Sequence, residues 1–202
     1  THSGTESFIS IPLIQNHPSG STILYFILQR FGFNSEQSAQ IFATLNSSSG
    51  KVFTSTNYRL IKDRKQLIVT KQDDLKGKYF TVSSADMTVT HEPKIIFSSH
   101  KAEDYLIPKS SSICNLDLGK LEFPLIMRQW RKGDYFYPFG MKSKKKKLSD
   151  FFIDLKLSLP EKESTFILQS GDKIAAVLGY RIDDRFRISA STQMVLRVEI
   201  QK

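Results

Sequence analysis

The chain has 202 residues, of which 40% are hydrophobic and 24% are charged, with 29 lysines and arginines against 20 acidic residues. This length and composition are ordinary for a globular protein of one or two small domains that can bury a core. The formal net charge of +9 favours a polyanionic partner, and both nucleic acid and an anionic membrane surface meet that description.

Several classes of protein are disfavoured by what the sequence lacks. No apolar run approaches the roughly 20 residues that span a bilayer, and no basic-then-apolar leader opens the sequence, so secretion is not indicated. The single cysteine, Cys114, excludes an internal disulfide and a multi-cysteine metal site, and we expect it to be a small buried residue in a reducing cytosol. The four histidines are scattered without metal-ligand spacing, so no metal site is predicted.

Two helices are predicted near the start of the chain. Residues 1–17 are expected to be polar, irregular chain. Ser21–Phe31 is predicted to be helical, because its apolar residues recur at helical spacing and Gly32 can end the helix. A second helix is predicted from Ser35, capped by Asn34 or by Ser35 itself. The predicted apolar side of this helix consists of Ala39, Phe42 and Ala43.

Two strands are predicted after these helices. Lys51–Leu60 and Gln66–Thr70 alternate between apolar and polar side chains, and the charged residues 62–65 are predicted to form the turn between them. Residues 1–75 are therefore predicted to form a helix pair with a β-hairpin. Residues 76–115 are predicted to be a strand-rich connecting segment.

The remainder of the chain alternates strands with one clear helix. Ser98–Ser112 is expected to be loop, and Phe123–Arg131 is a strand candidate. Apolar side chains at i, i+3, i+4 and i+7 from Leu148 predict a helix that Pro160 stops. A hairpin is predicted around Gly171, which can take a positive φ.

A final strand, Met194–Ile200, has one buried face and completes a mixed α+β region over residues 116–202. The predicted fold class is α+β, with a small helical-pair-plus-hairpin domain followed by a mixed α+β C-terminal domain.

The strongest functional signal is the segment of residues 128–147, called here the basic aromatic segment. It contains eight lysines and arginines and one acidic residue, a net charge of +7 in a chain whose total is +9. Cations interleaved with flat rings are typical of nucleic-acid binding. The aromatic residues are Trp130, Tyr135, Phe136, Tyr137 and Phe139.

Two interpretations of this segment compete. The lysine run Lys144–Lys147 could be an ordinary solvated face, and the rings could belong to the core. The concentration of charge favours anion binding, because adjacent lysines repel one another unless phosphates supply the counter-charge. The run also precedes a predicted helix, whose first N–H groups favour an anion. Gly133 and Gly140 allow the chain to turn tightly on either side of the rings.

No convincing catalytic pair emerges elsewhere. Residues 48–51 lack the upstream glycine and the hydroxyl of a phosphate loop. The adjacent Asp183 and Asp184 are predicted to form a turn, and Asp134 is predicted to be a turn or cap residue. A second, weaker basic cluster either continues the same surface or is simply exposed. Its members are Arg181, Arg185 and Arg187.

Two stretches resemble the C-terminal domain of bacterial tRNA(Ile)-lysidine synthases. They are Arg128-x-Trp130-x-x-Gly133-Asp134-x-Phe136-x-Pro138-x-Gly140-Met141 and Lys146-Lys147-Leu148-Ser149-Asp150-x-Phe152-x-Asp154. The stretch Val177–Asp183 and the closing strand are also similar. Residues 18–72 resemble the middle, substrate-binding domain of the same family.

The resemblance implies an ATP- and Mg2+-dependent ligase that adenylates the wobble cytidine of tRNA(Ile) with a CAU anticodon and then joins free lysine to it. In the family this chemistry belongs to an N-terminal domain with a Ser-Gly-Gly-x-Asp-Ser motif, which the 202 residues lack. No catalytic residue and no cofactor are therefore expected here, and the chain alone is predicted to be inactive. Its implied role is to hold tRNA in the cytoplasm, and a homodimer is compatible with that role.

The residues implied to contact tRNA are Arg128, Arg131, Lys132, Lys142, Lys144, Lys145, Lys146, Lys147, Arg181, Arg185 and Arg187. Structural or stacking roles are implied for Trp130, Gly133, Asp134, Tyr135, Phe136 and Gly140, with Trp130 expected to pack in the core. Two positions depart from the family: Tyr135 stands where arginine is usual, and Ser143 where glycine is usual.

Two other functions fit the same charge. One is a non-catalytic RNA-binding interaction module, for example one associated with ribosomal RNA. The other is peripheral membrane binding through the lysine run. Asp150 and Asp154 on the polar face of the following helix count against the membrane.

Overall fold

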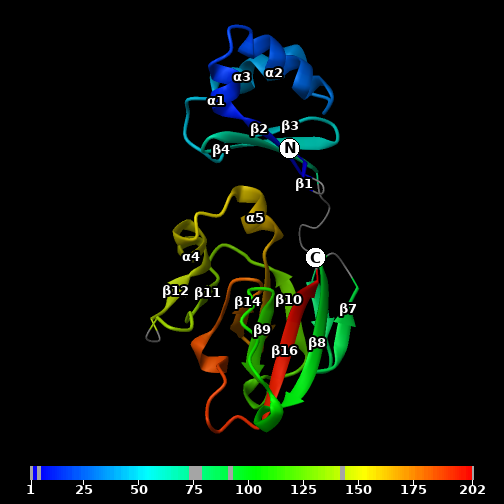
Figure 1. The fold of residues 1–202 in the computed structure, drawn as a ribbon, viewed down its shortest axis with the longest axis vertical. Coiled ribbons are helices and arrows are strands. Elements are labelled where there is room, and N and C mark those ends of the chain that lie inside the picture. Colours follow the sequence, from blue (N-terminus) through cyan, green and yellow to red (C-terminus); the bar gives the residue numbers. More distant parts are fainter. Residues whose placement is uncertain (1, 4–5, 73–78, 91–92, 142–143, 202) are drawn as a thin grey trace. The chain divides into compact units, whose positions relative to one another are not determined.

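The computed structural model describes all residues except 1, 4–5, 73–78, 91–92, 142–143 and 202 (Figure 1). The chain divides into two compact units, Thr1–Asp74 and Leu75–Lys202. Both contain helices and antiparallel sheets, which confirms the predicted α+β class.

Within the described residues, the first unit is a five-stranded antiparallel sheet with three helices on one face (Figure 1). The strand order is β1-β2-β5-β4-β3. The strands are β1 (His2–Ser3), β2 (Glu6–Ser10), β3 (Val52–Thr54), β4 (Tyr58–Asp63) and β5 (Gln66–Lys71). The helices are α1 (Ile11–Gln15), α2 (Gly20–Gln29) and α3 (Ser35–Ala43).

The two predicted helices of this unit are present, and of the predicted face of the second only Phe42 packs against the core. A capping box between Asn34 and Gln37 starts α3. The buried face of α3 holds Ser38 and Ile41, while Ala39 and Ala43 are exposed. The Ser38 hydroxyl can be buried because it donates a hydrogen bond to the Asn34 carbonyl.

Three further expectations for this unit were wrong. Residues 6–10 form β2, which pairs with β5 along its whole length, instead of irregular chain. The predicted strand 51–60 is broken at Ser55, whose hydroxyl donates to the Phe31 carbonyl, so that β3 and β4 are separate. β4 runs on to Asp63, and the turn shrinks to Arg64 and Lys65, with Arg64 at a φ of 33°.

The second unit is built from two antiparallel sheets around a shared core (Figure 1). The strand orders are β15-β14-β13-β10-β6 and β7-β8-β16-β9. The first sheet contains β6 (Tyr79–Val82), β10 (Leu125–Gln129), β13 (Phe166–Ser170), β14 (Lys173–Val177) and β15 (Arg181–Ile182). The second contains β7 (Met87–Val89), β8 (Lys94–Lys101), β9 (Ile113–Asp117) and β16 (Met194–Gln201).

Segment 76–115 supplies strands to both of these sheets. β6 pairs with β10, while β8 and β9 flank β16. The expected loop at 98–112 was wrong for its first four residues, which belong to β8 and pair with β16. The predicted division of the chain at residues 75 and 115 stays a prediction.

Cys114 and the C-terminal hairpin follow the sequence-based expectations. Cys114 on β9 is a free, buried thiol, as expected. The predicted hairpin at Gly171 is the β13–β14 pair, with that glycine at a φ of 55°. The predicted final strand is β16. No helix in the described part of the chain is both long and apolar enough to cross a membrane.

A second, smaller core lies on the other face of β13 and β14. Alternation along β13 sends Phe166 and Leu168 into the core between the sheets and Ile167 into this smaller core. The helix α4 (Leu148–Asp154) covers it with Phe151 and Phe152. The sheet is therefore buried on both faces, and the basic aromatic segment is held against its outer layer.

The predicted helix from Leu148 is shorter than expected. It ends at Asp154, and Lys156 then takes a φ of 57°, a left-handed conformation that terminates helices. Pro160 does not stop this helix but sits in the first turn of a new one, α5 (Leu159–Ser164), where proline is well tolerated. A capping box between Ser158 and Glu161 starts α5.

We expect Phe152→Ala to destabilise the second unit by about 3–5 kcal/mol, because it empties a fully buried site beneath the basic aromatic segment. Chemical denaturation measures the loss. The matched control is Ile153→Ala on the same helix, at a side chain that is 62% exposed and should cost little. Equal losses for both variants would contradict the assigned core.

Candidate nucleic-acid interface

A short two-stranded hairpin frames the basic aromatic segment. β11 (Tyr135–Phe136) pairs with β12 (Lys146–Lys147), so Tyr135 lies opposite Lys147. Phe136 is buried against Phe151, while Tyr135 on the other side of the strand is exposed. The backbone takes positive φ at Gly133 (101°) and Gly140 (86°), as the two predicted tight turns require.

Arg128 lies inside this segment and not on its surface. Its guanidinium donates to both carboxylate oxygens of Asp134, at 2.8 and 2.9 Å, and to the Gln169 side chain at 2.9 Å. Asp134 also accepts from the Arg131 backbone N–H at 2.7 Å. Only 12% of the Arg128 side chain is exposed. Arg128 therefore forms an internal bidentate pair with Asp134, and its expected phosphate contact stays a prediction.

Trp130 also faces inward. Its ring meets Phe152 edge-on at 5.1 Å between centroids, and its indole N–H donates to the Lys162 carbonyl at 2.6 Å. A half-buried indole with a satisfied N–H fits the packing role expected for Trp130.

The lysine run divides into paired and exposed members. Lys146 is half-buried and forms an ion pair with Asp154. Lys145 is exposed, and its ammonium lies 3.6 Å from the centre of the Tyr135 ring. Lys144 and Lys147 are exposed. Lys142 and Ser143 lie outside the described residues.

The second basic cluster is joined to the first through Asp183, which is completely buried. One carboxylate oxygen accepts from the Tyr137 backbone N–H at 2.8 Å, and both oxygens accept from Arg185. The hydrogen bonds with Asp183 raise the pKa of the Arg185 guanidinium above its ordinary value. Arg185 in turn lies 4.6 Å from the centre of the Tyr137 ring.

Further bonds tie the same two segments together. The Asp184 N–H donates to the Tyr137 carbonyl at 2.7 Å, and the Phe139 N–H donates to the Ile182 carbonyl at 3.0 Å. Arg181 donates to the Phe139 carbonyl at 3.1 Å, and Arg187 pairs with Asp184 at 2.6 Å. The sequence left open whether Arg181, Arg185 and Arg187 continue the basic surface, and these bonds bring the two clusters together.

Sequence reasoning missed the role of Asp183. It assigned this residue to a turn, and Asp183 does open the short 3-10 turn Asp184–Phe186 with a side-chain bond to the Arg185 N–H. The partner at Tyr137 is 46 residues away, so no local pattern could reveal it. Two carboxylates paired with arginines, the half-buried Asp134 and the fully buried Asp183, therefore hold the segments of this surface together.

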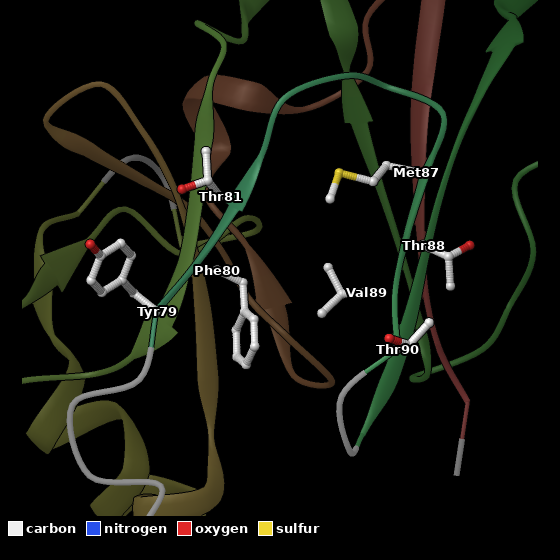
Figure 2. A pocket seen from close by; sticks show the side chains of 7 residues that line it. All are labelled: Tyr79, Phe80, Thr81, Met87, Thr88, Val89 and Thr90. Carbon is white, nitrogen blue, oxygen red and sulfur yellow. The ribbon is translucent and has the colours of Figure 1, made fainter.

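A pocket in the second unit is lined by residues without charged side chains. Figure 2 shows its lining on β6, on β7 and at Thr90, with Phe80, Met87 and Val89 facing the space between them. The lining residues are Tyr79, Phe80, Thr81, Met87, Thr88, Val89 and Thr90. This lining consists of apolar and hydroxyl side chains and includes no carboxylate, imidazole or cation.

No other chemistry-bearing constellation stands out. Burial raises the pKa of the Cys114 thiol, which keeps it from acting as a nucleophile near neutral pH. Among the residues that the structure describes, no group of three His, Cys, Asp or Glu side chains could hold a metal ion. The basic surface is therefore the candidate site, and its exposed cations suit an anionic ligand.

An exposed surface that combines cations with aromatic rings is of the kind that nucleic-acid-binding proteins present. Comparison with known protein families narrows that class. Residues 2–72 match the TilS substrate binding domain, and residues 125–200 match the TilS substrate C-terminal domain. The chain therefore belongs to the tRNA(Ile)-lysidine synthase family, whose substrate-binding and C-terminal domains it contains.

Individual relatives agree with this family. A tRNA(Ile)-lysidine synthase of Parabacteroides distasonis is 45% identical over 193 residues, covering 94% of this chain and 43% of the relative. One of Bacteroides thetaiotaomicron is 33% identical, covering 97% of this chain and 43% of the relative. This chain thus spans less than half the length of these relatives. A crystal structure of a TilS C-terminal domain shares the fold, with a TM-score of 0.51 over 61% of this chain and 97% of that chain, at 20% identity.

We expect Asp183→Asn to destabilise the second unit by about 2 kcal/mol or more, because it removes the charged acceptor of Arg185 from a fully buried position. Thermal unfolding measures the loss. The control is Asp172→Asn in the exposed β13–β14 turn, which should be close to neutral. An unchanged melting temperature for Asp183→Asn would contradict the anchoring role.

Proposed function

We propose that this chain is the tRNA-holding part of a tRNA(Ile)-lysidine synthase, an enzyme that joins lysine to the wobble cytidine of the CAU anticodon. The single observation that carries the proposal is the joined basic surface of the second unit. Family membership supports tRNA as the polyanion. ATP, Mg2+ and free lysine would be bound by a domain carrying the Ser-Gly-Gly-x-Asp-Ser motif, and no such motif occurs in these 202 residues.

Within the two basic clusters, the cations best suited to phosphates are the exposed ones for which the structure records no ion pair with any described residue. They are Arg131, Lys132, Lys144, Lys145, Lys147 and Arg181. Arg128, Lys146, Arg185 and Arg187 already pair with carboxylates, which neutralises much of their charge locally. We therefore assign phosphate contacts to the first group and a positioning role to the second.

Lysines suit the recognition of folded RNA. The deep, narrow major groove of an RNA helix hides most base edges, so proteins read its shape, phosphates and 2′-hydroxyls. An exposed ammonium on a long flexible chain can follow phosphates without a fixed bidentate geometry. The basic surface would then bind the tRNA body, while the wobble cytidine reacts in the domain that carries the Ser-Gly-Gly-x-Asp-Ser motif.

We expect the triple variant Lys144→Gln, Lys145→Gln, Lys147→Gln to bind tRNA(Ile) more weakly and with a shallower salt dependence. Each lost phosphate contact should reduce the slope of log affinity against log salt by about 1. Filter binding at several salt concentrations measures both quantities.

Two matched controls distinguish the effect of losing these three lysines from the effect of losing positive charge anywhere in the unit. The triple variant Lys94→Gln, Lys109→Gln, Lys173→Gln removes three exposed lysines elsewhere in the same unit and should leave the slope nearly unchanged. Lys146→Gln removes a lysine already paired with Asp154 and should have a smaller effect than Lys147→Gln. If the first triple variant binds like the unchanged chain, the lysine run is only a solvated face.

The proposal also predicts that this chain binds tRNA without catalysing lysidine formation. The 202-residue chain should bind tRNA(Ile) but form no lysidine from ATP and lysine, measured by mass spectrometry of the digested tRNA. The encoding gene should specify Ser-Gly-Gly-x-Asp-Ser upstream of Thr1. Absence of that motif from the gene would favour a non-catalytic RNA-binding module instead.

A further inference from the structure

Four side chains of the basic surface form a row in which two rings lie between two cations. The ammonium of Lys145 lies 3.6 Å from the centre of the Tyr135 ring. Tyr135 meets Tyr137 edge-on, with 6.3 Å between centroids and 80° between planes. The guanidinium of Arg185 lies 4.6 Å from the centre of the Tyr137 ring. The result is a ladder in the order Lys145, Tyr135, Tyr137, Arg185.

The ladder follows from strand alternation and a long-range anchor. Phe136 points into the core, so its neighbours Tyr135 and Tyr137 emerge on the same outer side of the chain. Asp183 then fixes the inner end of the ladder by binding both the Tyr137 N–H and the Arg185 guanidinium.

The two ends of the ladder are held very differently. Arg185 is bonded to the buried Asp183 through its backbone N–H and two guanidinium nitrogens, and 34% of its side chain is exposed. Lys145 is an exposed residue whose recorded contact within the described residues is the Tyr135 ring. The outer end is thus free to rearrange while the inner end stays fixed.

We propose that Tyr135 is a stacking site for an unpaired nucleobase, and that Lys145 covers the ring face until RNA binds. Lys145 exchanges the ring for a nearby phosphate, and the base takes the vacated face. This inference rests on the proposed function, because it names the part of the RNA that the surface takes besides phosphate.

The chemistry of the ladder favours a base over other ligands. Tyr135 is 42% exposed, so the residue stays accessible to solvent even with the Lys145 ammonium over its ring. An exposed cation–ring contact is weaker than stacking of a base on an aromatic ring. The displaced ammonium gains a charge-assisted bond to phosphate, which an isolated ring cannot offer. Rings beside cations that follow the backbone are the usual arrangement in single-strand binding.

The test uses the whole 202-residue chain and two RNA hairpins with identical stems and identical numbers of phosphates. One hairpin carries a four-nucleotide single-stranded 3′ overhang with bases, and the other carries an abasic overhang. The unchanged chain should bind the first roughly tenfold more tightly, the size of one base stack. A 2-aminopurine in the overhang should lose fluorescence on binding.

The variants locate the effect. Tyr135→Leu should abolish the preference for bases, whereas Tyr135→Trp should keep it. Lys145→Met should keep the preference but reduce the salt slope for both hairpins. The matched control is Tyr79→Leu on β6, an exposed tyrosine (65%) outside the segment, which should change nothing.

The outcomes separate this inference from the proposed function. If the unchanged chain binds both hairpins equally, or if Tyr135→Leu keeps the preference, the base site is overturned while RNA binding stands. If Lys145 keeps its ring-current shift in the NMR spectrum of the complex, the exchange step is overturned. If the unchanged chain binds neither hairpin nor tRNA, the proposed function and the base site both fall.

Discussion

The buried carboxylate of Asp183 is the constraint on which the candidate interface depends. It accepts a hydrogen bond from the Tyr137 backbone and holds the Arg185 guanidinium, and so joins two segments that are 46 residues apart in the chain. An uncompensated carboxylate in this position would be costly, so the arginine and the backbone donor are needed together. Loss of the Asp183 carboxylate would therefore disturb the arginine cluster and the aromatic hairpin together.

This constraint changes the meaning of the charge. The basic aromatic segment has a net charge of +7 by sequence, yet several of its cations and those of the arginine cluster are already paired. Paired cations shape the surface, while exposed cations without a recorded pair remain for a polyanion. The salt dependence of binding reports the second group, because these cations replace the counterions that are condensed on the phosphates.

Much of the local structure was predictable from sequence. The helix at Leu148, the hairpin at Gly171 and the strand β16 follow from periodicity and from a glycine that can take positive φ. The failures have a common cause in long-range pairing. Residues 6–10 have no clear strand pattern in the sequence, and they form β2 because they pair with β5. The polar residues 98–101 are part of a strand because they pair with β16.

The sequence by itself determined the α+β class, the concentration of cations and rings between residues 128 and 147, and the motifs of the lysidine synthase family. Each of these is a property of neighbouring residues. Only the tertiary structure decided that Arg128 is an internal partner of Asp134, that Trp130 packs against Phe152, and that Arg185 lies over Tyr137. The sequence gives the number of cations. The fold decides which of them lie beside a carboxylate and which stay available to a polyanion, because such pairs form between residues far apart in the chain as well as between neighbours.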